Sequence, residues 1–236
     1  MGCDIHFYVE VRKGEQWVSA DEWETEDDGD GVYAHVDYRK SYYSGRNYDL
    51  FAILANVRNG YGFAGVVTGS GFVPIAMPKG VPADASPEVK KAAEYWDADG
   101  HTHSWHTLSD LLAYDWTQVS THRGVIDAVT YQKWISWGRQ NGEDPDGWSG
   151  MVTGPKVEVL TEDVMNTRIE AIKAAHGADN WDIRKHIASE MSDVYCLAEW
   201  TQPYYKCCLS FWGEVIPRLL RLGKPEDVRI VFWFDN

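Results

Sequence analysis

The sequence predicts an α+β fold in which a mixed β-sheet, with its N- and C-terminal strands adjacent, is covered by several helices and connected by long glycine-rich loops. Polar and apolar residues alternate over 4–12 and again over 228–234, which is typical of strands with one buried face. Capped helical patterns lie between these strands. Because chain ends are often neighbours in space, we expect the two strands to pair within a single domain over 1–236, with 141–154 as the internal boundary candidate.

Turn and cap residues define the elements of the first part of the chain. After the first strand, Gly14 marks a turn from which 16–20 returns as a second strand, and 32–38 is a third strand candidate. Asn47 is placed to cap a helix over 48–58, whose apolar residues recur at helical spacing.

Glycine and proline separate the later elements. Residues 60–80 are rich in both and predict a long loop. The string Ser86-Pro87-Glu88 opens a helix that runs to Trp96, and Thr107 with Asp110 resembles a capping box. The remaining predictions are helices over 131–139, 161–176, 180–192 and 204–222, the last kinked at Pro217, a strand over 157–160, and strand or helix over 194–201.

The formal net charge of −14 restricts the kinds of partner. Proteins that bind nucleic-acid backbones neutralise phosphates with clustered Lys and Arg, so we expect no direct nucleic-acid backbone binding. Anionic membranes are disfavoured for the same reason, and no apolar run is long enough to span a bilayer. An acidic surface suits a basic host protein partner, or it serves solubility alone.

Cysteine usage and the chain start bear on localisation. The four cysteines, Cys3, Cys196, Cys207 and Cys208, form no C-x-x-C pair, and a disulfide between the last two would be strained. We therefore expect reduced thiols. The first residues contain no hydrophobic leader, so the expected location is the cytoplasm.

The segment 21–30 contains seven acidic residues in ten. The simplest interpretation is a solvated loop. A calcium loop running from Glu26 through Asp28 and Asp30 to Asp37 is the alternative, although such a loop normally begins with Asp and ends with Glu.

Two groups of potential metal ligands are spaced alike. Asp4 and His6 lie two positions apart on the first strand, so their side chains share a face. His101 and His103 repeat this spacing. If both groups face one hollow, these four residues would bind a divalent metal, zinc or manganese.

Two further residues are candidate acid/base groups for such a site, His106 and Asp235. The structural alternative is that His6 is a core histidine bonded to Asp4. In that case the histidines of 101–106 pack against Trp105 in a loop.

A candidate ligand site surrounds the start of the helix over 48–58. Arg46, Asn47, Asp49 and Arg58 lie near its ends, and a helix start preceded by glycine and arginine can hold an anion. With neighbouring aromatic residues, this group would bind a nucleotide or another small phosphorylated ligand. The alternative is a helix cap with surface ion pairs.

Some strings resemble known families. Asp4-x-His6 is similar to the opening motif, and Gly100-His101-Thr102-His103 to the closing motif, of calcineurin-like metallophosphoesterases, while the Gly-Asp and Gly-Asn-His motifs between them are absent. Over nearly its full length the chain resembles a family of tailed-phage and prophage proteins. The matching strings are MGCDIH at the start, NYDLFAILANVRNG at 47–60, H-x-HSW at 101–105 and RIVFWFDN at 229–236.

The phage resemblance implies a viral origin and the host cytoplasm. The metal-ligand groups favour a metal-dependent phosphoester hydrolase that acts on a nucleotide or small phosphate. The alternatives are a non-enzymatic protein that sequesters a nucleotide signal, and an acidic protein that binds and inhibits a host-defence partner.

Overall fold

The computed structural model describes residues 2–27, 32–96, 98–177 and 182–235. The chain divides into two compact units, and the single domain over 1–236 stays a prediction. The first unit comprises the residues up to Gly60, Gly71–Gln118 and the residues from Pro203 onward, and the second comprises Tyr61–Ser70 and Val119–Gln202. The predicted boundary at 141–154 therefore lies inside the second unit. Each unit contains helices and a sheet, which confirms the α+β class.

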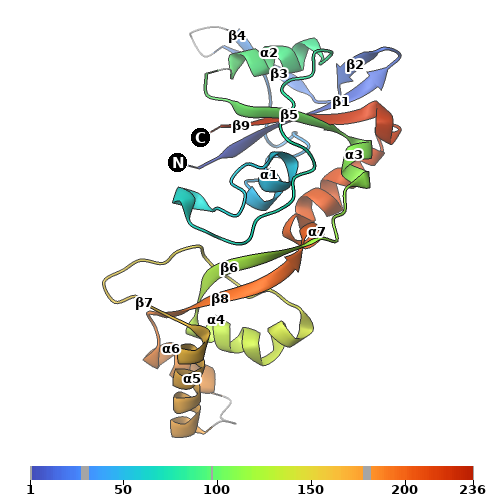
Figure 1. Ribbon diagram of the computed structural model, residues 1–236. Coiled ribbons are helices and arrows are strands. Elements are labelled where there is room, and N and C mark those ends of the chain that lie inside the picture. Colours follow the sequence, from blue (N-terminus) through green and yellow to red (C-terminus); the bar gives the residue numbers. More distant parts are fainter. Residues whose placement is uncertain (1, 28–31, 97, 178–181, 236) are drawn as a thin grey trace. The chain divides into compact units, whose positions relative to one another are not determined.

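The first unit is built on a 4-stranded sheet in the order β2-β1-β9-β5. These strands are β1 (Asp4–Lys13), β2 (Gln16–Ser19), β5 (His101–Thr107) and β9 (Val228–Asp235). β1 and β9 run antiparallel, with Asp4 opposite Asp235 and His6 opposite Trp233. The predicted pairing of the terminal strands is confirmed, and Figure 1 shows the two chain ends side by side. All pairs of this sheet are antiparallel, whereas the prediction was a mixed sheet.

Helices cover both faces of this sheet. Figure 1 shows α1 (Tyr48–Ala55) and α2 (Pro87–Tyr95) on opposite sides. The core on the α1 side contains the alternate residues Ile5, Phe7, Val9, Ile230, Phe232 and Phe234. The core on the α2 side contains Tyr8, Val231 and Trp233. Because both faces are covered, the polar parity of β1 is only partly open to solvent.

The remaining elements of the first unit are short. They are the strand pair β3 (Trp23–Asp27) and β4 (Val32–Val36), α3 (Leu108–Ala113), α7 (Tyr204–Cys207), the π-helical turn Phe211–Val215, α8 (Ile216–Leu220) and the 3-10 turn Pro225–Asp227. The helix predicted over 204–222 is thus interrupted. Pro217 has no N–H to donate to the preceding turn, and the π-helical turn lies directly before α8.

The second unit has a 3-stranded sheet in the order β6-β8-β7, with β7 parallel to β8. Its elements are the 3-10 turn Phe63–Gly65, β6 (Val119–Asp127), α4 (Ala128–Lys133), the π-helical turn Trp134–Gly138, the 3-10 turn Arg139–Asn141, β7 (Glu158–Leu160), α5 (Glu162–His176), α6 (Ile183–Glu190) and β8 (Val194–Pro203). Its core joins α4, α5 and α6 to the sheet through Tyr131, Ile169, Ile187 and Ala198.

Within the described ranges, none of the helices combines the length and the apolar character that crossing a bilayer requires. The cysteines Cys3, Cys196, Cys207 and Cys208 are all free thiols, as expected.

Candidate functional site

Most of the predicted site residues meet where β1 begins and β9 ends. We call this group the β1 rim, and it consists of Cys3, Asp4, His6, Arg46, Arg58, His101 and Asp235. Direct bonds join Arg46 to Asp4 and His6 to Asp235. His101 pairs with Phe234 of β9, next to Asp235, which places it at the same end of the sheet. Strand pairing and the loop before α1 therefore bring together groups that are far apart in sequence.

Arg46 and Asp4 form a two-pronged ion pair. Arg46 donates from Nε to Asp4 Oδ1 over 2.7 Å and from Nη2 to Oδ2 over 2.5 Å. This bonding lowers the pKa of Asp4. The two side chains are 52% and 54% exposed, so the pair remains accessible from solvent. A Cβ at Gly2 would lie 2.8 Å from Arg46 Nη1, so glycine at that position leaves room for the guanidinium.

The cap of α1 fixes Arg46 beside β1. Asn47 Oδ1 accepts from the backbone N–H groups of Asp49 and Leu50, and Asn47 Nδ2 donates to the carbonyl of Cys207. Asn47 is thus occupied by structural bonds. Burial raises the pKa of Asp49 to about 6, and its charge acts on Cys208 in the core. Of the predicted ligand-binding group, Arg46 and Arg58 belong to the rim, whereas Asn47 and Asp49 serve the helix start.

His6 is held by a carboxylate and by two aromatic rings. Its Nε2 lies 3.1 Å from Asp235 Oδ2, and its ring centroid lies 4.1 Å from that of Trp96 and 5.7 Å from that of Trp233. Burial lowers the pKa of His6, while the bond to Asp235 opposes this shift. A carboxylate oxygen accepts, so the neutral ring donates from Nε2 and keeps Nδ1 as its basic nitrogen.

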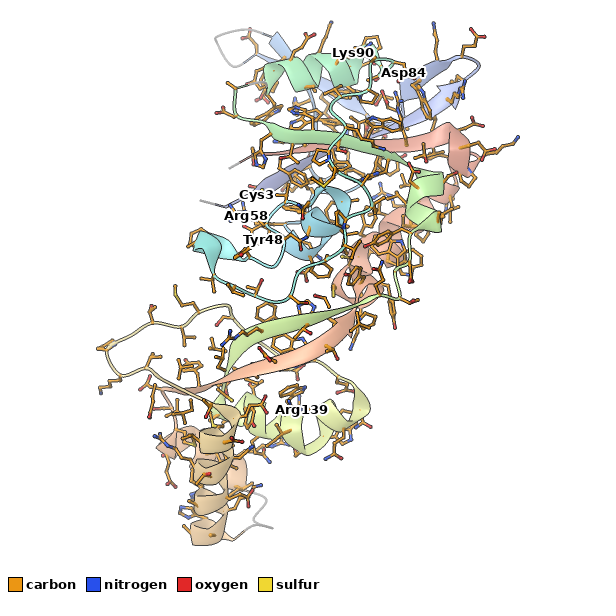
Figure 2. The ribbon with its side chains drawn as sticks, viewed as in Figure 1. Cys3, Tyr48, Arg58, Asp84, Lys90 and Arg139 are labelled. Carbon is orange, nitrogen blue, oxygen red and sulfur yellow. The ribbon has the colours of Figure 1, made fainter. Side chains whose placement is uncertain are left out.

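Arg58 lies on the α1 side of the rim. Its guanidinium is stacked 4.9 Å from the ring centroid of Tyr48, and Nη2 donates to the carbonyl of Gly2 over 3.3 Å. Its backbone has a φ of 51°, in the left-handed region that non-glycine residues rarely adopt. Figure 2 shows Arg58, Tyr48 and Cys3 next to one another.

Cys3 and Tyr48 are rim contacts that the sequence did not single out as site residues. The Cys3 side chain is buried and hydrogen-bonded with Arg58, and burial raises the pKa of its thiol. A buried thiol with a raised pKa is a poor nucleophile. We therefore assign Cys3 a positioning role beside Arg58.

The three histidines of β5 point to different places. The pairing of β5 with β9 shifts register between His101 and Ser104, and Thr102 has a φ of 58°. As a result His101 contacts Phe234 on the α1 side, whereas His103 stacks 5.1 Å from Trp233 on the α2 side. Since β9 lies between β1 and β5, the indole of Trp233 separates His103 from His6.

His101 remains at the rim, and His106 does not. His101 Nδ1 lies 2.8 Å from Thr102 Oγ1, while its Nε2 is buried and has no hydrogen-bond partner among the described residues. His106 is fully buried, donates from Nε2 to the carbonyl of Leu54 over 2.8 Å, and has its pKa lowered to about 4 by burial. These surroundings suit a structural histidine, not the predicted acid/base role.

The predicted metal ligands are not gathered around one point. Among the described residues, no group of three His, Cys, Asp or Glu with donor atoms within 4.8 Å of one another includes Asp4, His6, His101 or His103. The rim offers carboxylate and imidazole donors. One of the carboxylates, that of Asp4, is already bonded to Arg46 through both of its oxygens. A zinc or manganese ion at this place stays a prediction.

The acidic segment is partly structural. Asp21 is partly buried, and its Oδ2 accepts from the backbone N–H of Val9 over 2.8 Å. Lys40 bridges Glu22 and Glu24 at 3.4 and 2.7 Å. The predicted calcium loop includes Asp28 and Asp30, which lie outside the described residues.

Comparison of the chain with protein-family models, with curated proteins and with solved structures gave no match. The resemblance to phage proteins and the metallophosphoesterase-like motifs stay predictions.

Proposed function

We propose that this chain is a phage-type protein that binds a small phosphorylated molecule of the nucleotide class at the β1 rim and hydrolyses one of its phosphoester bonds. The observation that carries the proposal is the meeting, at one strand end, of two guanidinium groups with an imidazole–carboxylate pair. One guanidinium group can donate to two phosphate oxygens at once. An imidazole oriented by a carboxylate can transfer a proton.

Arg46 is suited to exchange partners. Ion pairs between half-exposed side chains contribute little to stability, so Asp4 holds Arg46 only weakly. A phosphate group carries more charge than a carboxylate and matches the same two-pronged geometry. In the proposal it displaces Asp4 from Arg46. Arg58 is restrained by Tyr48 and Gly2 and supplies the second positive charge.

His6 supplies the proton transfer. Its ring is held between aromatic neighbours and by Asp235, so Nδ1 has a defined direction. A neutral imidazole in this state accepts a proton from an attacking water, and the nearby carboxylate stabilises the imidazolium that forms.

A divalent ion is part of the proposal. The residues that would hold it are Asp4 and Asp235, with His101 as a further donor, because zinc and manganese take carboxylate oxygen and imidazole nitrogen, and Nδ1 of His6 is kept for the proton transfer. Such an ion polarises a phosphoryl oxygen when bound.

The test is release of inorganic phosphate from nucleoside mono-, di- and triphosphates by chelator-treated protein, with and without added zinc or manganese. His6→Ala should reduce the rate by roughly 100-fold or more. His35→Ala is the matched control, because His35 is a partly buried histidine 4.0 Å from a carboxylate of Glu26 in the same unit. Equal rates in the parent and His6→Ala would exclude His6 from the chemistry.

A non-enzymatic nucleotide binder is the second candidate. The aromatic surroundings of both cationic and imidazole groups favour it, since Tyr48 lies under Arg58 and Trp96 lies against His6. In that case calorimetry detects nucleotide binding that Arg46→Gln weakens, and chromatography recovers the nucleotide unchanged.

A further inference from the structure

The second unit holds a group of metal-type donors that the sequence analysis did not identify. His176, His186 and Glu190 present ligand atoms that all lie within 4.8 Å of one another. His176 Nε2 lies 2.9 Å from Glu190 Oε1. The rings of His176 and His186 are stacked, with centroids 3.8 Å apart and planes 13° from parallel.

Helix packing brings these donors together. His176 is the last residue of α5, while His186 and Glu190 are one helical turn apart on α6 and share a face. The helices are joined through Ile169 and Ile172 of α5 and Ile187 of α6, all buried in the same core. The donors lie at the edge of this contact, where side chains of both helices remain partly exposed.

We infer that His176, His186 and Glu190 form a zinc-binding site that links α5 to α6. Two imidazole nitrogens and one carboxylate oxygen are the donor set of many zinc sites that keep a fourth position for water. Donor atoms of a tetrahedral zinc site lie roughly 3.4 Å from one another. The observed arrangement is close enough that rotation of the two rings completes it, and the ion replaces the bond between His176 and Glu190.

This site is independent of the proposed function. It lies in the second unit, whereas the β1 rim lies in the first. It also uses none of the residues assigned to phosphate binding or proton transfer. Zinc here acts as a cross-link between helices, because an ion held by both helices stabilises the folded arrangement over the unfolded chain.

The test is to titrate the chelator-treated protein with zinc alone and to measure the binding by calorimetry. His186→Ala and Glu190→Gln should each raise the zinc dissociation constant of this site at least about tenfold. Glu190→Gln keeps a hydrogen-bonding group beside His176, so it separates loss of a ligand from loss of packing. Glu170→Gln is the control, since Glu170 is an exposed carboxylate on α5 that pairs with Lys173, and it should leave zinc binding unchanged.

Hydrogen exchange supplies the second measurement. Zinc should slow amide exchange in α5 and α6 of the parent protein but not of His186→Ala. Cobalt in place of zinc should give the visible absorption of a four- or five-coordinate ion, and His186→Ala should lose it. Zinc binding that survives His186→Ala and Glu190→Gln but disappears in Asp4→Asn would overturn the inference and assign the ion to the β1 rim.

Discussion

The ladder between β1 and β9 carries a carboxylate–arginine pair near each end, and the two pairs differ in burial. At one end Asp4 and Arg46 are both about half exposed, with side-chain exposures of 54% and 52%. Toward the other end Glu10 and Arg229 are 0% and 2% exposed and lie opposite each other across the strands. The buried pair is committed to the fold, whereas the exposed pair is the one that exchanges with phosphate in our proposal.

The buried pair is embedded in a network. Arg229 donates from Nε to Glu10 Oε2 over 2.7 Å and from Nη1 to Asp84 Oδ1 over 2.8 Å, and its guanidinium lies 4.1 Å from the ring centroid of Trp17. Glu10 Oε1 accepts from the backbone N–H of Ser86 over 2.6 Å, at the cap of α2. Removing Glu10 or Arg229 leaves the other one buried without its buried charge partner.

The largest expected effect is on stability at this buried pair. Glu10→Gln should lower the free energy of unfolding by about 3 kcal/mol, because Arg229 would stay buried with only the exposed carboxylate of Asp84 to pair with it. Urea denaturation at neutral pH measures this loss. The double variant Glu10→Leu with Arg229→Met removes both charges and should lose less than Glu10→Gln alone. A loss below that of an ordinary surface substitution would show that the pair is not committed to the fold.

The contrast between the pairs also shows what the sequence could predict. Alternation predicted the two terminal strands, and the tendency of chain ends to be neighbours predicted their pairing, which brings Asp4, His6 and Asp235 together. Caps were predicted well where a side chain bonds the next turn, as at Asn47 and Ser86. Thr161, the first residue of the helix predicted over 161–176, is the N-cap of α5 and forms no such bond. These features depend on residues close in sequence or on strand periodicity.

The features that were missed depend on tertiary surroundings. β6 buries Ser120, His122 and Gly124 on one parity, so it shows no apolar alternation. No strand was predicted over β5, because its two covered faces carry His, Ser and Trp rather than aliphatic residues. The equal spacing of His101 and His103 predicted a shared face, and the register shift at Thr102 separates them.

The next largest effect is expected at His106, the buried histidine of β5. His106 has its pKa lowered from 6.5 to about 4, so the unfolded chain takes up a proton that the folded protein refuses. Stability should fall as the pH drops from 6.5 toward 4. At about 1.4 kcal/mol for each pH unit, the His106 contribution to this loss is about 3 kcal/mol.

His106→Gln tests this contribution, because glutamine does not titrate and its amide can still donate to the carbonyl of Leu54. As the solution is acidified, the unfolding free energy of the parent should fall more steeply than that of His106→Gln. The pH dependence of stability in His6→Gln should differ less from that of the parent, because Asp235 opposes the effect of burial on the pKa of His6. Parallel curves for parent and His106→Gln would contradict the burial argument.

The smallest expected effect on stability is at the exposed pair of Asp4 and Arg46. Arg46→Gln should leave the urea midpoint unchanged, because the solvent-accessible bond to Asp4 contributes little. It should weaken binding of a nucleoside phosphate by roughly 10- to 100-fold, the range expected for a lost charge-assisted hydrogen bond to phosphate. Arg39→Gln is the matched control, since Arg39 is an exposed arginine of the same unit that bonds Tyr38. If Arg46→Gln and Arg39→Gln weaken binding equally, the loss reflects net charge alone, and the exposed pair is not the place where phosphate is held.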